Sequence, residues 1–176
     1  EKYENGASLK ISRIPIKEGL FSTVKSCNYL PNVLMKKEAL DAGVDFTVSL
    51  DAQGNLGESS TENCAIILND EFLVPHFKQI LRGVTLVRAM HLAQILVQEG
   101  QLKAVRHADI SQENLAHAQE ILMLGTTMDV LAITNYEGRK VGSGKPGPIF
   151  YELKKLIERD QLENHEMVTE CESLAL

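Results

Sequence analysis

Short apolar runs separated by turn residues predict β-strands along much of the chain. Residues 7–16 alternate in part and end at Pro15 and its neighbour, which predicts an edge strand. Residues 45–50 are rich in β-forming side chains and lead into the turn signature of residues 51–55, so we expect a hairpin. The almost wholly apolar run 64–68 predicts a strand buried on both faces.

Four other segments space their apolar residues as helices do. They are residues 31–42, 81–99, 111–117 and 149–163. Pro31 suits a first helical turn, Gly43 is placed to end that helix, and Ser111 is a suitable N-cap. A helix that starts directly after Gly83 offers unpaired backbone N–H groups.

The remaining apolar runs complete a sheet. Strands are expected to end near Val74 and to cover residues 102–106, 121–124 and 130–133. Strands and helices then alternate unevenly, with hairpins between them, which predicts an α/β domain with a mixed sheet, curled or barrel-like. Residues 142–147 match GxGxxG, but they follow a predicted turn rather than the strand of a βαβ unit, so they do not indicate a dinucleotide-binding fold. The nucleotide-binding motif GxxxxGK[ST] is absent from the sequence.

Composition sets limits on size, partners and location. With 176 residues, 44% hydrophobic and 24% charged, the chain is long enough for one sizeable core. A net charge of -6 with scattered basic residues argues against nucleic-acid binding. The sequence lacks an apolar run of roughly 20 residues and the charged and apolar regions of a signal peptide. We therefore expect a cytoplasmic protein that does not interact with membranes.

The thiols and imidazoles suggest no metal site. Cys27, Cys64 and Cys171 are odd in number and widely spaced, which favours reduced thiols. We interpret Cys27 as a small buried filler rather than as a reactive group. The histidines, His76, His91, His107, His117 and His165, show no spacing typical of metal ligands.

Lys25 is the first candidate for chemistry, because it lies between an extended approach and a predicted helix. A lysine so flanked is expected to be partly desolvated, and a desolvated amine can attack a carbonyl to form a Schiff base. Considered alone, without the other motifs, Glu58 is interpreted as a solvated loop carboxylate. Each considered alone, residues 83–85 are interpreted as a helix cap and residues 125–127 as a turn.

Five blocks in one order along the chain resemble the fold-type IV, or class IV, pyridoxal-phosphate enzymes. The blocks are residues 25–34 (KSCNYLPNVL), 57–63 (GESSTEN), 80–85 (ILRGVT), 125–127 (GTT) and 142–148 (GSGKPGP). This group contains the branched-chain and D-amino-acid aminotransferases and aminodeoxychorismate lyase. The resemblance covers the chain to about residue 160 and implies the large domain of the D-amino-acid aminotransferase-like fold, a mixed sheet curled into a partial barrel with flanking helices.

The resemblance also implies roles around pyridoxal 5'-phosphate. Lys25 matches the catalytic lysine that forms the Schiff base with the cofactor and moves the substrate proton. Glu58 matches the carboxylate that pairs with the pyridine nitrogen, and Tyr29 matches the phenol that contacts the ring oxygen. Leu81 matches the leucine that packs on the ring face.

The phosphate and substrate contacts follow from the same resemblance. Val84 and Thr85 match the helix start that binds the cofactor phosphate, and Thr126 matches the threonine on its other side. Thr127 lies where a backbone amide meets the substrate carboxylate. Lys145 falls in the shared loop and is interpreted as part of a structural turn.

Two departures from the family pattern bear on these roles. Ser59 stands where the family has glycine, so the backbone there has less freedom to adopt positive φ. Leu86 stands where arginine is common after Gly-Val-Thr.

The domain organisation expected from the resemblance is a single cofactor-carrying domain over residues 1–162. An acidic, frayed tail follows over residues 163–176. Because the chain starts at Glu1 without methionine, we expect it to be the C-terminal part of something longer. The smaller N-terminal domain of the family has no counterpart in this sequence.

The function implied is transamination in amino-acid metabolism, between a branched-chain L- or D-amino acid and a 2-oxo acid, by a homodimeric enzyme. Two alternatives stay open from the sequence. One is aminodeoxychorismate lyase, which uses the same lysine for elimination. The other is a catalytically incomplete isolated domain.

Overall fold

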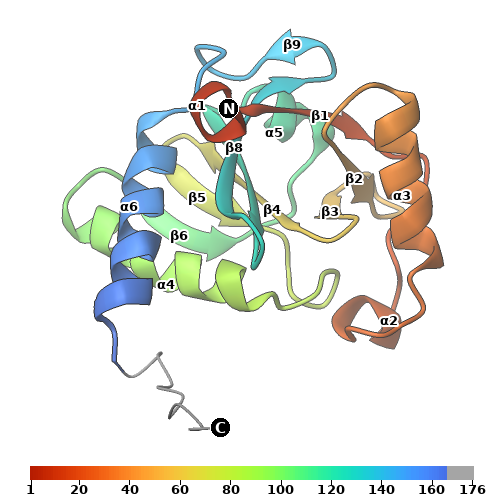
Figure 1. Cartoon of the computed structure of the whole chain (residues 1–176), viewed down its shortest axis with the longest axis horizontal. Coiled ribbons are helices and arrows are strands. Elements are labelled where there is room, and N and C mark those ends of the chain that lie inside the picture. The colour runs from red at the N-terminus through yellow and green to blue at the C-terminus, as the bar shows by residue number, and fades with distance from the viewer. Residues whose placement is uncertain (166–176) are drawn as a thin grey trace, which may run out of the picture.

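One mixed β-sheet forms the centre of the molecule (Figure 1). The computed structural model describes residues 1–165. Its strands are β1 (Ala7–Ile11), β2 (Phe46–Leu50), β3 (Leu56–Ser59), β4 (Asn63–Leu68), β5 (Glu71–Val74), β6 (Ala104–His107), β7 (Glu120–Gly125), β8 (Asp129–Tyr136) and β9 (Arg139–Lys140). The strand order is β3-β2-β1-β8-β7-β4-β5-β6, and β9 pairs with β8.

Parallel and antiparallel pairs coexist in this sheet, as the uneven alternation of elements predicted. Strand β1 runs parallel to both β2 and β8, and β5 runs parallel to β6. The pairs β2–β3, β4–β5, β4–β7 and β7–β8 are antiparallel. The expected hairpin through residues 51–55 is the connection between β2 and β3.

Helices pack around the sheet (Figure 1). They are α1 (Lys2–Asn5), α2 (Leu20–Thr23), α3 (Leu30–Asp41), α4 (Val84–Gln98), α5 (Gln112–Ala116) and α6 (Pro148–Glu163). As predicted, Ser111 is the N-cap of α5, where its side chain accepts a hydrogen bond from the Asn114 N–H. No helix within residues 1–165 is both long and apolar enough to cross a membrane.

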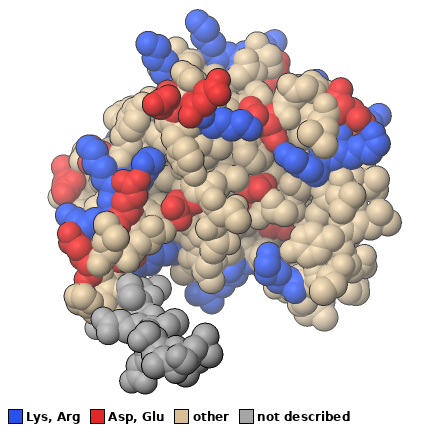
Figure 2. All heavy atoms as spheres, viewed as in Figure 1, with Lys and Arg blue, Asp and Glu red and all other residues tan. Residues whose placement is uncertain are grey.

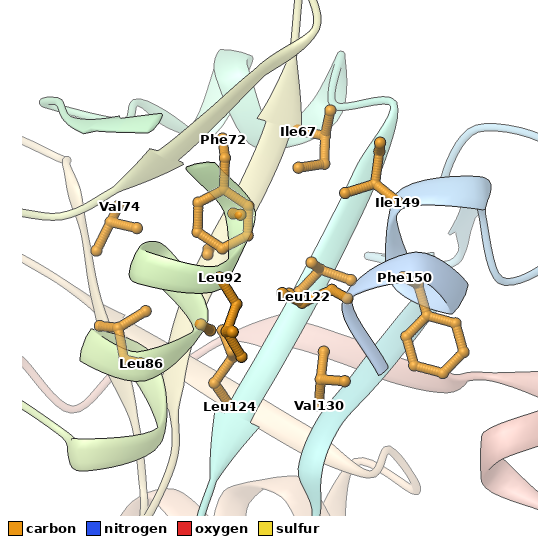
Figure 3. Close-up of a cluster of buried hydrophobic side chains, with 14 of the residues drawn as sticks. Ile67, Phe72, Val74, Leu86, Leu92, Leu122, Leu124, Val130, Ile149 and Phe150 are labelled. Carbon is orange, nitrogen blue, oxygen red and sulfur yellow. The ribbon is translucent and has the colours of Figure 1, made fainter. Parts of the chain in front are cut away.

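The central strands are buried on both faces, so two hydrophobic clusters form. In β7, Leu122 and Leu124 belong to the cluster under α4 and α6, whereas Ile121 and Met123 belong to the opposite cluster. Figure 3 shows the first cluster, which includes Ile67, Phe72, Val74, Leu86, Leu92, Leu122, Leu124, Val130, Ile149 and Phe150. This double burial explains why the central strands read as continuous apolar runs.

Strand β1 corrects the expectation of an edge strand over residues 7–16. It ends at Ile11 and lies between β2 and β8, inside the sheet. Pro15 does not prevent this position, because it follows the strand and removes no N–H from the ladder. The strand signal therefore belonged to the first five residues of that segment alone.

The cysteines differ in their surroundings. Cys27 is exposed, so its interpretation as a buried filler is wrong: it lies in the loop before α3, next to the exposed Asn28. Cys64 is a free thiol buried in β4, where burial raises its pKa to about 12. Cys171 lies outside the described residues. Within residues 1–165 no three or more His, Cys, Asp or Glu side chains are placed to hold a metal ion.

The C-terminal helix ends where the sequence predicted. Helix α6 runs to Glu163, as expected for residues 149–163. Asn164 still donates its N–H to the Asp160 carbonyl, at 3.1 Å. The remainder of the predicted tail, residues 166–176, lies outside the described residues.

A buried carboxylate on β7 fixes the start of α6. The two carboxylate oxygens of Glu120 accept the N–H groups of Ile149 and Phe150, each at 2.8 Å. A Cβ on Gly147 would lie 2.3 Å from the Glu120 Cδ, so only glycine allows this approach. Burial raises the pKa of Glu120, and the two N–H donors offset part of that rise. The loop that includes Lys145 is thus a structural connection into α6.

Substitution of Glu120 by alanine should destabilise the fold. The change leaves two buried N–H groups at the start of α6 without acceptors, and we expect the free energy of unfolding to fall by about 3 kcal/mol. Urea denaturation of E120A measures this loss. The control is E18A, which removes an exposed glutamate and should change stability by less than about 0.5 kcal/mol. Equal stability of the two variants would contradict the capping role.

Candidate active site

Lys25 lies in the loop between α2 and α3, at the surface of the described chain. Its Nζ donates a hydrogen bond to the Tyr29 hydroxyl at 3.1 Å. The expected desolvation of Lys25 is wrong for this chain, because Lys25 and the nearby Val24 and Leu30 are exposed. The amine is therefore accessible to an incoming carbonyl and is oriented by the Tyr29 phenol.

Glu58 lies in β3 and is only 8% exposed, so the solvated-loop interpretation of this residue is wrong. Its Oε2 accepts the Leu81 N–H at 2.9 Å and a hydrogen bond from Asn63 Nδ2 at 3.3 Å. Burial raises the pKa of this carboxyl. The Leu81 N–H and the ammonium groups of Lys17 and Lys25 act in the opposite direction.

The start of α4 lies beside this carboxylate. Gly83 is the N-cap of α4 and supplies no side-chain cap, so the first N–H groups of this 15-residue helix keep no internal acceptor. Asn63 fills the space where Gly83 lacks a side chain: a Cβ there would lie 2.1 Å from the Asn63 Oδ1. Asn63 also donates to the Leu81 carbonyl at 3.0 Å. Unpaired N–H groups and the helix dipole make this end of α4 suited to an anion.

Two adjoining cavities collect seven of the eight predicted site residues. The larger, of about 260 Å³, is lined by Lys25, Thr61, Asn63, Leu81, Arg82, Gly83, Val84, Thr85, Leu124, Gly125 and Thr126. The smaller, of about 30 Å³, is lined by residues that include Lys17, Lys25, Tyr29, Glu58, Asn63 and Leu81. The larger volume is close to the lower end of the range for small-molecule sites, roughly 300–1,000 Å³.

Thr127 is the one predicted site residue that lines neither cavity. It lies in the turn between β7 and β8, directly after Thr126. That turn is closed by a hydrogen bond from the Met128 N–H to the Gly125 carbonyl, at 3.1 Å. The role assigned to the Thr127 amide stays a prediction.

The structure adds residues that the sequence reasoning did not single out. Asn63, the last residue of the block 57–63, contacts Glu58, Leu81 and Gly83. Lys17 enters the smaller cavity from the segment after β1. The position of Asn63 at the end of the 57–63 block was a usable signal for the first, whereas nothing in the local sequence pointed to Lys17.

The two departures from the family pattern differ in how they fit the fold, since the buried Ser59 hydroxyl has no hydrogen-bond partner among the described residues. Ser59 is in strand β3 and is not among the residues with positive φ, so a side chain costs no backbone strain there. Leu86 is fully buried in the cluster between α4 and the sheet, where an apolar side chain packs well.

Comparison with known proteins assigns the chain to a family. Residues 4–136 match the family described as Amino-transferase class IV. The chloroplastic D-amino-acid transaminase of Arabidopsis thaliana is 35% identical over 157 residues, which are 88% of this chain and 42% of that protein. A probable branched-chain-amino-acid aminotransferase of Aquifex aeolicus is 31% identical over 72% of this chain and 40% of its own.

Solved structures agree with this assignment. The branched-chain amino acid aminotransferase of T.th. with pyridoxamine 5'-phosphate superposes with a TM-score of 0.82 at 25% identity, over 89% of this chain and 51% of that chain. The Escherichia coli branched-chain enzyme gives 0.80 at 25% identity, over 88% and 52%. The chain thus spans about half the length, or less, of these relatives. It belongs to the class IV aminotransferase family, and its curled α/β fold is that of the branched-chain enzymes.

Substitution of Gly83 by alanine should disturb the start of α4. The new Cβ meets the Oδ1 of Asn63, which cannot turn away because its amide is held by Glu58 and Leu81. We expect a loss of about 1–3 kcal/mol in the free energy of unfolding, as for other overpacked sites. The matched control is G125A, where the new Cβ would make an ordinary contact of 3.5 Å with Glu62. Similar urea midpoints for the two variants would refute this close packing.

The raised pKa of Glu58 predicts a pH dependence of stability. Between the unfolded value, about 4.3, and the higher folded value, the native state binds more protons than the unfolded state. The contribution of Glu58 to stability is therefore fully present below about pH 4 and is lost as the pH rises through the folded pKa. Urea denaturation at stepped pH should show wild type losing stability relative to E58Q across this window. A difference that does not vary with pH would contradict it.

Proposed function

We propose that this protein catalyses pyridoxal-phosphate-dependent transamination between an amino acid and a 2-oxo acid. The observation that carries the proposal is the pair of adjoining cavities, which gather an accessible lysine amine, a buried carboxylate and an uncapped helix start. These three features come from separate segments of the chain: Lys25, Glu58 and the run from Gly83 to Thr85. Family membership supports the same chemistry, since the class is named for it.

The lining residues fit pyridoxal 5'-phosphate by the chemistry of their donors and acceptors. The Lys25 amine can hold an aldehyde covalently. The Glu58 carboxylate is suited to a protonated ring nitrogen, and Leu81 offers an apolar side chain beside it. The phosphate suits the N–H groups at Val84 and Thr85 and the Thr126 hydroxyl, since all three residues line the larger cavity.

Each side chain then has a defined task. When bound, the cofactor supplies an electron-accepting ring that stabilises negative charge at the substrate Cα. Lys25 Nζ would take the proton from that carbon and deliver it to C4' of the cofactor, and the Tyr29 hydroxyl at 3.1 Å orients the amine. Glu58 holds the proton on the ring nitrogen. We assign the substrate carboxylate to the Thr127 backbone amide.

The substrate is proposed to be a D-amino acid or a branched-chain L-amino acid. The relatives named above include a D-amino-acid transaminase and branched-chain enzymes, at 35% and 31% identity. The substrates in those names belong to the relatives, so the substrate of this chain must be measured with a panel of amino-acid donors. D-alanine and L-leucine, each with 2-oxoglutarate as acceptor, separate the two classes in one coupled assay.

We also propose that the protein is a homodimer. Helices α2 and α3 and the loop between them expose large apolar side chains beside Lys25, namely Leu20, Phe21, Val24, Leu30, Val33 and Leu34. In Figure 2 the surface around α2 is almost free of charged side chains. Exposed apolar surface of this kind is typical of an interaction site.

The cytoplasmic location stays a prediction, because the Arabidopsis relative is named as chloroplastic.

Covalent trapping tests the lysine directly. Purified protein incubated with pyridoxal 5'-phosphate and reduced with borohydride should carry the label on the peptide that contains Lys25. K25A should lose both the label and transamination, with a fall in rate of at least about 10³-fold because the covalent anchor and the base are one group. The control K145A removes an exposed lysine from the turn before α6 and should keep both.

Two results would overturn the proposal. Label on a lysine other than Lys25 would refute the assigned anchor. A protein that neither binds the cofactor nor transfers an amino group from any donor in the panel would refute the function for this chain.

A further inference from the structure

The segment after β1 crosses β3 and carries Lys17 to the carboxylate of Glu58. Ile16 is buried and donates its N–H to the Leu50 carbonyl at 3.3 Å, which fixes the segment against β2. Gly57 leaves room for it, since a Cβ on Gly57 would lie 2.5 Å from the Ile16 Cδ1. The next residue is Lys17, and its side chain reaches Glu58, the residue after Gly57.

The two oxygens of the Glu58 carboxylate have separate partners. Oε2 accepts from the Leu81 N–H and from Asn63 Nδ2. Oε1 lies 3.7 Å from the Lys17 Nζ, an ion pair in which the lysine side chain is 24% exposed and the glutamate 10%. At that distance the ammonium acts mainly through its charge, and low exposure limits screening by solvent.

We propose that Lys17 is a positioning residue of this site, whose ammonium keeps the Glu58 carboxylate ionised and directed toward the cavity. The inference rests on the proposed function for its purpose, because the ionised carboxylate is the form that pairs with a protonated ring nitrogen. Its physical basis, the effect of Lys17 on Glu58, does not depend on any cofactor.

The other charged groups at the cavity do not replace Lys17. Lys25 favours the ionised carboxylate too, but in the proposed function its amine is committed to the cofactor. Glu62 lines the cavity and carries the opposite charge, although its carboxylate is engaged by Thr61. The neutral donors to Glu58 come from Asn63 on β4 and from the backbone before α4. Of the two cavities, Arg82 lines only the larger, so Lys17 is the remaining cation among the residues that line the smaller one.

The first test is a carboxyl titration of the protein without added cofactor. Glutamate side chains are labelled with ¹³C, and the Glu58 signal is assigned by its loss in E58Q. In K17M the midpoint of Glu58 should rise by about one pH unit or more, since an opposite charge at this range lowers a carboxyl pKa by about 1–3 units. K17R should restore the wild-type midpoint.

The control for this titration is K10M. Lys10 is a partly buried lysine in β1 that lines a different cavity, so its removal changes the net charge equally. The Glu58 midpoint in K10M should match wild type. An unshifted midpoint in folded K17M, or an equal shift in K10M, would overturn the role of Lys17. If K17M does not fold, K17Q takes its place in the same comparison.

The second test measures the dissociation constant of pyridoxal 5'-phosphate against pH by fluorescence titration. At pH values between the Glu58 midpoint of wild type and that of K17M, the variant should bind up to about tenfold more weakly than wild type. At pH values above both midpoints the carboxylate is ionised in each protein, so the two dissociation constants should be equal. A loss that is the same at every pH indicates a merely structural role and would overturn the proposal.

The two tests separate failure of the inference from failure of the proposed function. A shifted Glu58 midpoint in a protein that binds no pyridoxal phosphate refutes the function and leaves the ion pair established. Cofactor binding with an unshifted midpoint refutes the inference and leaves the function intact.

Discussion

The buried carboxylate of Glu58 is the constraint on which the site depends. Burial of an ionisable group is costly unless donors compensate, and here the compensation comes from the Leu81 N–H, Asn63 and Lys17. These donors belong to three segments that are far apart in sequence. The need to satisfy one carboxylate therefore holds β3, β4, the segment after β1 and the approach to α4 in one arrangement.

Asn63 extends that constraint from the carboxylate to the helix. Its amide donates to Glu58 and to the Leu81 carbonyl, while its Oδ1 occupies the space left by the missing side chain of Gly83. The acidic end and the anion-binding end of the cavity are thus set by one buried side chain. The proposed function assigns a basic ring nitrogen to the first of these ends and a phosphate to the second.

A second buried carboxylate, at the start of β7, plays a purely structural part. Glu120 accepts the first N–H groups of α6, and α6 in turn packs with α4 on one face of the sheet. Figure 3 shows how residues of both helices meet those of the central strands. The position of α4 is supported by this cluster along the helix and by the Asn63 contacts at its start.

The sequence by itself determined the local elements and their order. Apolar runs, Pro31, Gly43 and Ser111 were enough to place most helices and strands, because these signals act within a few residues. Five short motifs were enough to identify the family. Tertiary structure decided the rest: β1 lies inside the sheet, Glu58 is buried, and Lys25 and Cys27 are exposed. The burial of a charged side chain such as Glu58 and the order of strands in the sheet depend on segments distant in the chain, as does the approach of Lys17 to Glu58. Local pattern carries no record of these.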